Sequence, residues 1–102
     1  VCILDYTKGQ IDGFVKDVMP LEPIADKWRA FNWHVIEIDG HDFGQILDAF
    51  DEASRTKGKP TFILANTVKG KAVSFMEGRI EWHGAAPSKE QAQKAIEEIK
   101  QS

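Results

Sequence analysis

Short apolar runs alternate with longer amphipathic segments along this chain, and this alternation limits its possible folds more than any other feature. A continuous run of four to eight apolar residues suits a buried strand, whereas apolar residues at a period near 3.6 suit a helix. Strands that are separated by helices pair in parallel through crossover connections. We therefore predict an α/β fold, in which helices flank a parallel sheet and ligands bind at the carboxyl ends of the strands.

Three apolar runs have the pattern of buried strands. They are residues 1–4, 33–38 and 61–65. The last run follows Pro60, and a proline favours an extended conformation in the residue before it. Because the carboxyl ends of parallel strands meet at one edge of a sheet, we expect the loops after these strands to lie on one rim.

Three segments have the pattern of amphipathic helices. The first begins at Pro23, which suits the first helical position, and continues for about three turns. The second is capped by Asp42 and ends near Gly58, and the third is capped by Ser88. In both, a glutamine three residues after the cap completes a capping-box pattern. Aromatic residues at helical spacing are expected to pack in the core: Trp28, Phe31, Phe43 and Phe50.

The 22 residues from Asn66 to Pro87 show neither the apolar run of a buried strand nor the apolar spacing of a helix. An irregular stretch of this length inside a compact domain is usually either functional or disordered. This stretch is therefore a place to look for chemistry.

The charge balance and the single cysteine limit the partners and the compartment. With 13 basic and 16 acidic residues and no block of like charges, we expect no nucleic-acid partner and no membrane partner. The longest uncharged stretch, residues 60–68, is far shorter than the ~20 residues that span a bilayer. Cys2 cannot form an internal disulfide, and we expect it to be a small buried residue of a cytoplasmic protein.

Five segments, taken together, carry a family resemblance. They read Leu-Asp-Tyr-Thr-Lys-Gly-Gln-Ile-Asp-Gly at 4–13, Gly-His-Asp at 40–42, Lys-Pro-Thr at 59–61, Lys-Gly-Lys-Ala-Val-Ser-Phe-Met-Glu at 69–77 and Trp-His-Gly-Ala-Ala-Pro at 82–87. In order and spacing they resemble the second half of the thiamine-diphosphate-binding domain of transketolase, over essentially the whole chain. The likeness is greatest to the N-terminal subunit of split bacterial and archaeal transketolases.

The resemblance implies a function within an assembly. It implies part of a transketolase, a transferase of the pentose phosphate pathway, which uses thiamine diphosphate to move a two-carbon ketol unit from a ketose phosphate to an aldose phosphate. It also implies an oligomer with a second transketolase subunit, which carries the pyrimidine-binding domain and the glutamate that activates the cofactor. We therefore expect residues 1–102 to be the C-terminal half of a cofactor domain, a fragment of a larger subunit that is inactive alone.

The resemblance also implies a metal site. In the family a divalent ion, Mg²⁺ or Ca²⁺, bridges the cofactor diphosphate to the protein, because a hard cation neutralises the charge of the diphosphate. Its ligands here would be the Thr7 hydroxyl, where the family has asparagine, and the Gly9 carbonyl, so that both residues bind metal and cofactor. The family's acidic ligand lies in an upstream Gly-Asp-Gly motif, which these 102 residues do not contain.

His83 is the implied catalytic residue. The corresponding histidine of the family contacts the cofactor diphosphate and a substrate hydroxyl, so His83 would be both catalytic and cofactor-binding. An imidazole suits this role because it can donate a hydrogen bond from either nitrogen.

Structural roles compete at each of these residues. From spacing alone, Thr7 is a turn residue bonded to nearby backbone, and His83 is a surface histidine. His41 lies beside two aspartates, but this run suits a strand-to-helix turn better than a catalytic dyad. Structural roles are also expected for a half-exposed strand histidine and two solvated loop lysines: His34, Lys69 and Lys71.

Two other functions stay open at this point. One is a related thiamine-diphosphate enzyme such as a deoxyxylulose-phosphate synthase, against which the Trp-His-Gly segment argues. The other is a non-catalytic α/β scaffold or binding module that kept the fold and lost the metal site. Thr7 favours this second alternative, because a hydroxyl is a weaker ligand than an amide carbonyl.

Overall fold

The computed structural model describes residues 1–102, which divide into two compact units. The sheet unit comprises Val1–Tyr6 and Pro20–Thr67, and the loop unit comprises Thr7–Met19 and Val68–Ser102. Each unit therefore joins two stretches that are distant in the sequence. No helix in either unit has the length and apolar character needed to cross a membrane.

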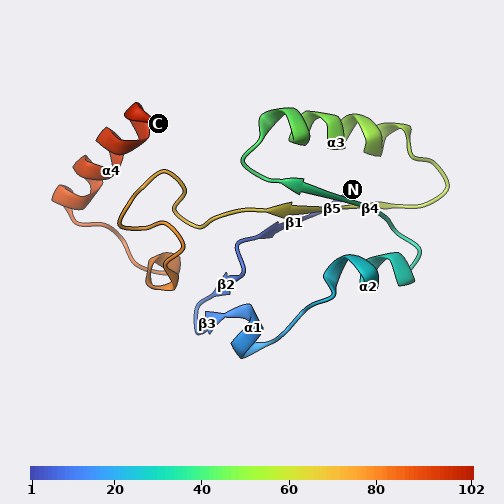
Figure 1. Ribbon diagram of the computed structural model, residues 1–102, viewed down its shortest axis with the longest axis horizontal. Helices are drawn as coiled ribbons and strands as arrows, with labels where there is room; N and C mark the ends of the chain where they lie inside the picture. Colours follow the sequence, from blue (N-terminus) through green and yellow to red (C-terminus); the bar gives the residue numbers. More distant parts are fainter. The chain divides into compact units, whose positions relative to one another are not determined.

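A three-stranded parallel sheet forms the centre of the sheet unit (Figure 1). Its strands are β1 (Cys2–Tyr6), β4 (His34–Asp39) and β5 (Thr61–Asn66), in the order β1-β5-β4. β5 pairs with a strand on both sides, and its first five residues are all buried. The predicted parallel sheet is confirmed.

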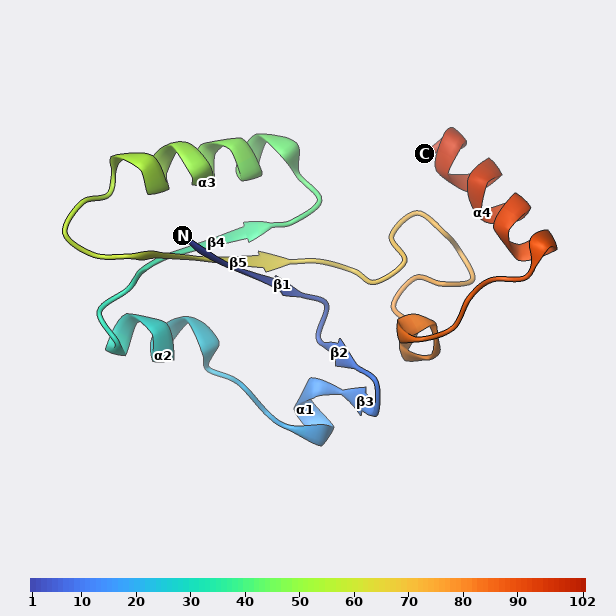
Figure 2. The same cartoon turned by 180° about the vertical axis from the view of Figure 1, so that it is seen from behind.

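Two helices, α2 (Ile24–Ala30) and α3 (Phe43–Arg55), cover opposite faces of this sheet (Figures 1 and 2). Successive residues of a strand point to opposite faces, so β5 contributes to a separate core on each side. On one face the buried residues are Tyr6, Ile24, Phe62 and Leu64. On the other they are Ile38, Ala49, Ile63 and Ala65. The expected flanking helices are therefore confirmed.

The helix ends agree with the predicted caps in one case and differ in the other. The Asp42 carboxylate accepts a hydrogen bond from the Gln45 N–H at 3.1 Å, so the predicted cap is present. The predicted capping box is only half formed, because the Gln45 side-chain carbonyl accepts from the Asp39 N–H and not from the Asp42 N–H. α2 is shorter than predicted, with 7 residues, because Asn32 has a φ of 66° that ends the helical path. Pro23 lies just before the helix, at the cap, and not at its first position.

The prediction that the helical aromatics are core residues is correct only for Trp28. Its ring stacks on Phe62 at a centroid distance of 4.0 Å. By contrast, Phe31 and Phe43 lie at helix ends and are 81% and 80% exposed. Phe50 is 45% exposed although it lines an open pocket with the core residues Ile38 and Ile63, because this part of the sheet face is incompletely covered.

The first strand is also less buried than predicted. It lies at the edge of the sheet, where neighbours cover it on fewer sides than β5. Ile3 is 52% exposed, and Cys2, expected to be buried, is only half-buried.

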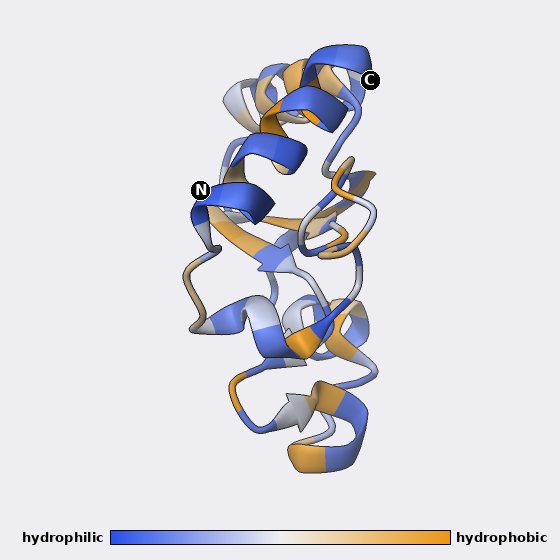
Figure 3. Cartoon of the chain, turned by 90° about the vertical axis from the view of Figure 1, so that its left-hand side faces the viewer, coloured by the Kyte–Doolittle hydropathy of each residue, from blue (hydrophilic) through white to orange (hydrophobic).

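The loop unit contains four short elements and one longer helix. The sequence periodicity did not predict β2 (Gly9–Gln10), β3 (Gly13–Phe14), α1 (Val15–Val18) or the 3₁₀ helix η1 (Ile80–His83). The longer helix, α4 (Lys89–Gln101), begins with the predicted capping box between Ser88 and Gln91. Its ribbon is hydrophilic along most of its turns, with hydrophobic positions between them, as an amphipathic helix requires (Figure 3).

The irregular stretch is a folded loop in its first half. Gly78 donates its N–H to the Lys69 carbonyl at 2.8 Å, which closes the loop at its base. Inside it, the Val73 side chain is buried, and the Val73 carbonyl accepts two backbone hydrogen bonds. Gly70 has a φ of 69° and lies so close to Met76 that a side chain at this position would overlap it. Several backbone groups of this loop are therefore satisfied within the loop itself.

Candidate functional site

The carboxyl ends of the three strands gather at one rim of the sheet unit, as expected. Gly40, after β4, donates its N–H to the Asn66 carbonyl at the end of β5, at 2.7 Å. The Thr67 hydroxyl donates to the Asp5 carboxylate of β1. A side chain at Gly40 would overlap Thr67, so glycine is required for this close approach.

Thr7 and Gly9 lie in one tight turn of the loop unit. Lys8, between them, has a φ of 61°, and this left-handed conformation reverses the chain direction. The Thr7 hydroxyl lies 3.5 Å from the Gly9 carbonyl oxygen, to which it donates a long hydrogen bond. The structural role expected for Thr7, a hydroxyl bonded to nearby backbone, is therefore present. The same geometry also brings together the two oxygens that the resemblance implies as metal ligands.

The separation of these oxygens fits two neighbouring ligands of a hard cation. Oxygen ligands lie 2.3–2.6 Å from Ca²⁺, so two of them at right angles are about 3.3–3.7 Å apart, and about 3 Å around Mg²⁺. Both oxygens are neutral, and the chain contains no group of three His, Cys, Asp or Glu residues placed to hold a metal. The spacing of the Thr7 and Gly9 oxygens therefore fits two neighbouring ligands of Ca²⁺, and any further ligands would lie outside this pair.

Ile80 links this turn to the segment that ends at His83. The Ile80 Cδ1 lies so close to the position of a Cβ at residue 9 that the two atoms would overlap, so the first residue of η1 packs directly against the Gly9 backbone. Residues that are about seventy positions apart in the sequence thus meet within the loop unit. The structure brings the His83 segment against the turn that holds Thr7 and Gly9.

His83 is the last residue of η1 and is exposed. Its imidazole makes no hydrogen bond or ion pair within the chain. Both ring nitrogens are therefore available to a ligand, as a group that donates to a phosphate or a hydroxyl requires.

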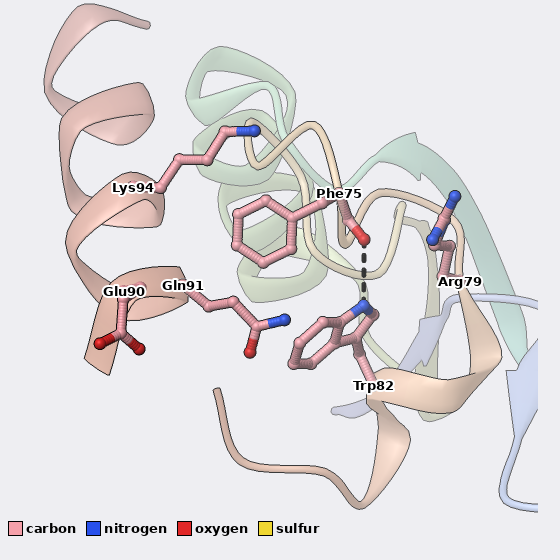
Figure 4. A pocket seen from close by; sticks show the side chains of 6 residues that line it. All are labelled: Phe75, Arg79, Trp82, Glu90, Gln91 and Lys94. Atoms are coloured by element: carbon pink, nitrogen blue, oxygen red, sulfur yellow. Dashed lines mark hydrogen bonds between the residues drawn. The ribbon is translucent and has the colours of Figure 1, made fainter. Parts of the chain in front are cut away.

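Trp82, the residue before His83, is a functional candidate that the sequence did not distinguish. Its side chain is half-buried, and its indole N–H donates to the Phe75 carbonyl at 3.0 Å (Figure 4). The two rings meet edge to face at a centroid distance of 5.6 Å. They belong to the lining of an open pocket of about 310 Å³, formed with Arg79, Glu90, Gln91 and Lys94.

The other two histidines and Lys71 have the structural settings expected of them, whereas Lys69, expected to be solvated, is half-buried. The His41 N–H donates to the Asp39 carboxylate at 2.9 Å, in the turn that leads to the Asp42 cap. His34 is half-exposed in β4 and hydrogen-bonds to Glu52 of α3 at 2.6 Å, a partner that the sequence pattern did not reveal. The exposed Lys71 lies 3.3 Å from Glu77.

Electrostatics at the turns agree with these roles. Hydrogen bonds from the backbone and side chain of Gln45 lower the pKa of Asp42, which favours a charged cap. Burial, with a hydrogen bond to Glu22, raises the pKa of Tyr6, so this hydroxyl stays protonated at neutral pH. Neither group is poised to exchange a proton near neutral pH.

Known proteins similar to this chain form a consistent group. The chain matches the family model "Transketolase, thiamine diphosphate binding domain" over residues 1–101. It is 46% identical over 99 residues to the 6-deoxy-6-sulfo-D-fructose transketolase subunit SqwG of a Clostridium species, covering 97% of this chain and 36% of that subunit. It is 39% identical over 99 residues to an apulose-4-phosphate transketolase subunit of Phocaeicola vulgatus, covering 97% of this chain and 35% of that protein.

The fold comparison agrees with the sequence comparison. The crystal structure of transketolase from Campylobacter jejuni superimposes with a TM-score of 0.87 at 31% sequence identity, covering 96% of this chain and 15% of that one. The chain spans about a third of the length of the two curated relatives.

Proposed function

Because this chain belongs to the family of transketolase thiamine-diphosphate-binding domains, as its motifs predicted, we propose that it acts as part of a transketolase. The reaction is the transfer of a two-carbon ketol unit from a ketose phosphate to an aldose phosphate. The observation that carries this proposal is the contact between Ile80 and Gly9, which joins the turn of Thr7 and Gly9 to the segment of His83. A cofactor diphosphate could then be held by both segments at once.

In this proposal, Thr7 and Gly9 supply two oxygen ligands to a divalent cation, Mg²⁺ or Ca²⁺. The cation neutralises the diphosphate charge, which the two neutral oxygens alone cannot do. Their separation of 3.5 Å matches neighbouring ligands of Ca²⁺, whereas Mg²⁺ would require the two oxygens to move closer together. The remaining ligands come from the diphosphate itself and from other parts of the assembly.

His83 is the catalytic residue of this proposal. Its exposed imidazole has no partner within the chain, so it can donate one hydrogen bond to the diphosphate and another to a substrate hydroxyl. Thiamine diphosphate, when bound, supplies the carbanion-stabilising chemistry. The residues of this chain hold the phosphate end of the cofactor and position hydrogen-bond donors toward the substrate.

The partners proposed are a second subunit with the pyrimidine-binding domain, in an oligomer, and sugar phosphates as substrates. The printed names of the two relatives, both transketolase subunits, support the first. These names mention different sugars, a sulfo-fructose and apulose 4-phosphate, so we propose the class of substrate and keep the pentose phosphate pathway as one setting among others. We place the protein in the cytoplasm and take this chain as the C-terminal half of the cofactor domain.

The direct test is to purify the whole subunit that contains this chain, together with its partner, and to supply a ketose phosphate and an aldose phosphate. Sugars two carbons shorter and two carbons longer should form only when thiamine diphosphate and Mg²⁺ are both present. If the assembly binds no cofactor by calorimetry and transfers nothing, the non-catalytic scaffold is the better explanation.

A further inference from the structure

The exposed ring of His83 raises the question of what keeps it in place. A catalytic side chain must be held close to one geometry, because small displacements of a reacting group cost large factors in rate. The imidazole itself has no hydrogen-bond partner in the chain. Its position must therefore be fixed through its own backbone and the residues on either side. Gly84, on one side, has no side chain that could anchor it.

Trp82, on the other side, is anchored at two points. Its indole N–H donates to the Phe75 carbonyl at 3.0 Å, and its ring packs edge to face against the Phe75 ring (Figure 4). The N–H of an indole is its only donor, and a half-buried donor of this kind loses free energy if it has no partner. The anchor therefore fixes both the orientation of the Trp82 ring and the end of η1.

The residues around the Phe75 carbonyl are attached in turn to α4. Glu98 accepts hydrogen bonds from the N–H and the hydroxyl of Ser74, at 2.5 and 2.8 Å. Lys94, one turn before Glu98, lies with its ammonium group 5.4 Å from the centre of the Phe75 ring, on the ring face that the cation–π interaction favours. Residues 74 and 75 are thus attached to a capped 13-residue helix, and a rigid element supports the acceptor of the indole bond.

We propose that Trp82 is a positioning residue for His83, which acts through the hydrogen bond from its indole N–H to the Phe75 carbonyl. The proposal rests on the proposed function in one respect, since it takes His83 to be the catalytic group. A hydrogen bond of ordinary strength changes the equilibrium constant between the held and the released orientation about fivefold. If the ring is mostly released without this bond, its loss lowers the turnover number by about that factor.

The experiment replaces Trp82 by phenylalanine in the assembled enzyme, because Trp82→Phe keeps an aromatic ring and removes the donor. Trp28→Phe is the matched control, since Trp28 stacks on Phe62 in the sheet unit and makes no indole hydrogen bond. We expect kcat to fall about fivefold in Trp82→Phe and to stay within twofold of wild type in the control. Equal kcat values in the two variants would overturn the proposal.

A double mutant tests whether the effect passes through His83. If Trp82 acts by positioning this ring, Trp82→Phe should change kcat by less than about twofold in a His83→Ala background, since there is no ring left to position. A further fivefold fall in that background would show that Trp82 contributes independently, which contradicts the proposal.

A measurement on the ring itself separates this proposal from the proposed function. With ¹³C-labelled histidine, the spectrum of the whole protein has one signal for each histidine, and His83→Ala identifies the signal of His83. We expect Trp82→Phe to shift or broaden this signal and Trp28→Phe to leave it unchanged. If the wild-type assembly transfers no ketol unit, the proposed function fails, while the His83 signal still decides the positioning role. An unchanged signal in Trp82→Phe would refute it.

Discussion

The end of the Ile80 side chain lies so close to Gly9 that it would overlap a Cβ at this position. This contact joins the turn of Thr7 and Gly9 to η1, the 3₁₀ helix that ends at His83. Gly9 lacks the left-handed φ that would itself demand glycine, so the requirement at this position is one of space.

Gly9→Ala should therefore displace the Ile80 side chain. We expect a cost of about 1 kcal/mol, at the lower end for insertions into packed sites, because the atom in the way is the far end of a side chain that can move aside. We expect a lower melting temperature of the assembled protein and weaker binding of thiamine diphosphate by calorimetry.

A second substitution provides the control for this prediction. Ile80→Val removes the Cδ1 that a side chain at position 9 would meet. The double variant Gly9→Ala/Ile80→Val should recover part of the stability and affinity that Gly9→Ala loses. If it recovers neither, the overlap with Ile80 is not the reason why position 9 is a glycine.

Some parts of this fold follow from the sequence because their signals are local. Asp42 caps α3 and Ser88 caps α4 as predicted, since each cap needs only a side chain and a backbone N–H three residues away. The run 61–65 is buried throughout, because a strand with neighbours on both edges and helices on both faces is apolar at every position.

Other parts of the fold cannot be predicted from the spacing of apolar residues along the sequence. Helical spacing placed Phe50 on an apolar stripe, and Phe50 is nevertheless 45% exposed. Whether another element covers such a stripe depends on the tertiary structure and not on the spacing. The elements β2, β3, α1 and η1 have two to four residues each, too few for any period to emerge.

Some features of the candidate site could also be predicted from the sequence, and others could not. Thr7, Gly9 and His83 were found by resemblance to family motifs, and spacing alone favoured structural roles for them. The contact of Ile80 with Gly9 and the indole bond of Trp82 are long-range or side-chain-specific, and no local pattern encodes them.

The attachment of the folded loop to α4 should depend on pH. Hydrogen bonds from the backbone and hydroxyl of Ser74 lower the pKa of Glu98 from its ordinary value of 4.5. A carboxyl with a lowered folded-state pKa stabilises the fold above its ordinary pKa, and this contribution is lost as the pH falls through the lower value. The Ser74 amide proton in NMR should therefore shift with an inflection below pH 4.5.

The neighbouring glutamate supplies the comparison. Glu97→Ala removes a carboxylate that bonds to Gln93 and not to Ser74, so the Ser74 inflection should persist. Glu98→Ala should abolish it. An inflection that survives in Glu98→Ala would mean that another group titrates at Ser74.

Thr7→Asn should strengthen metal-dependent cofactor binding in the complete assembly. The amide carbonyl of asparagine is a better oxygen ligand than a neutral hydroxyl, and one better ligand is worth about 1–2 kcal/mol if it is scaled as a charge-assisted hydrogen bond. Calorimetry with thiamine diphosphate and Mg²⁺ measures this gain, and Thr7→Val, which has no hydroxyl, should bind more weakly than wild type. Unchanged affinity in both variants would remove Thr7 from the metal site.

His83→Ala in the complete enzyme should lower turnover far more than stability. The His83 side chain is exposed and has no partner within the chain, so its removal should change the free energy of unfolding by no more than about 0.5 kcal/mol. A positioned donor or acid–base group, by contrast, contributes roughly 10²–10⁴-fold to the rate. The measurement is kcat beside the melting temperature, with His34→Ala as a comparison, because His34 bonds to Glu52 and should affect stability without affecting chemistry. Full activity of His83→Ala would exclude His83 from catalysis and leave it only a place in the loop.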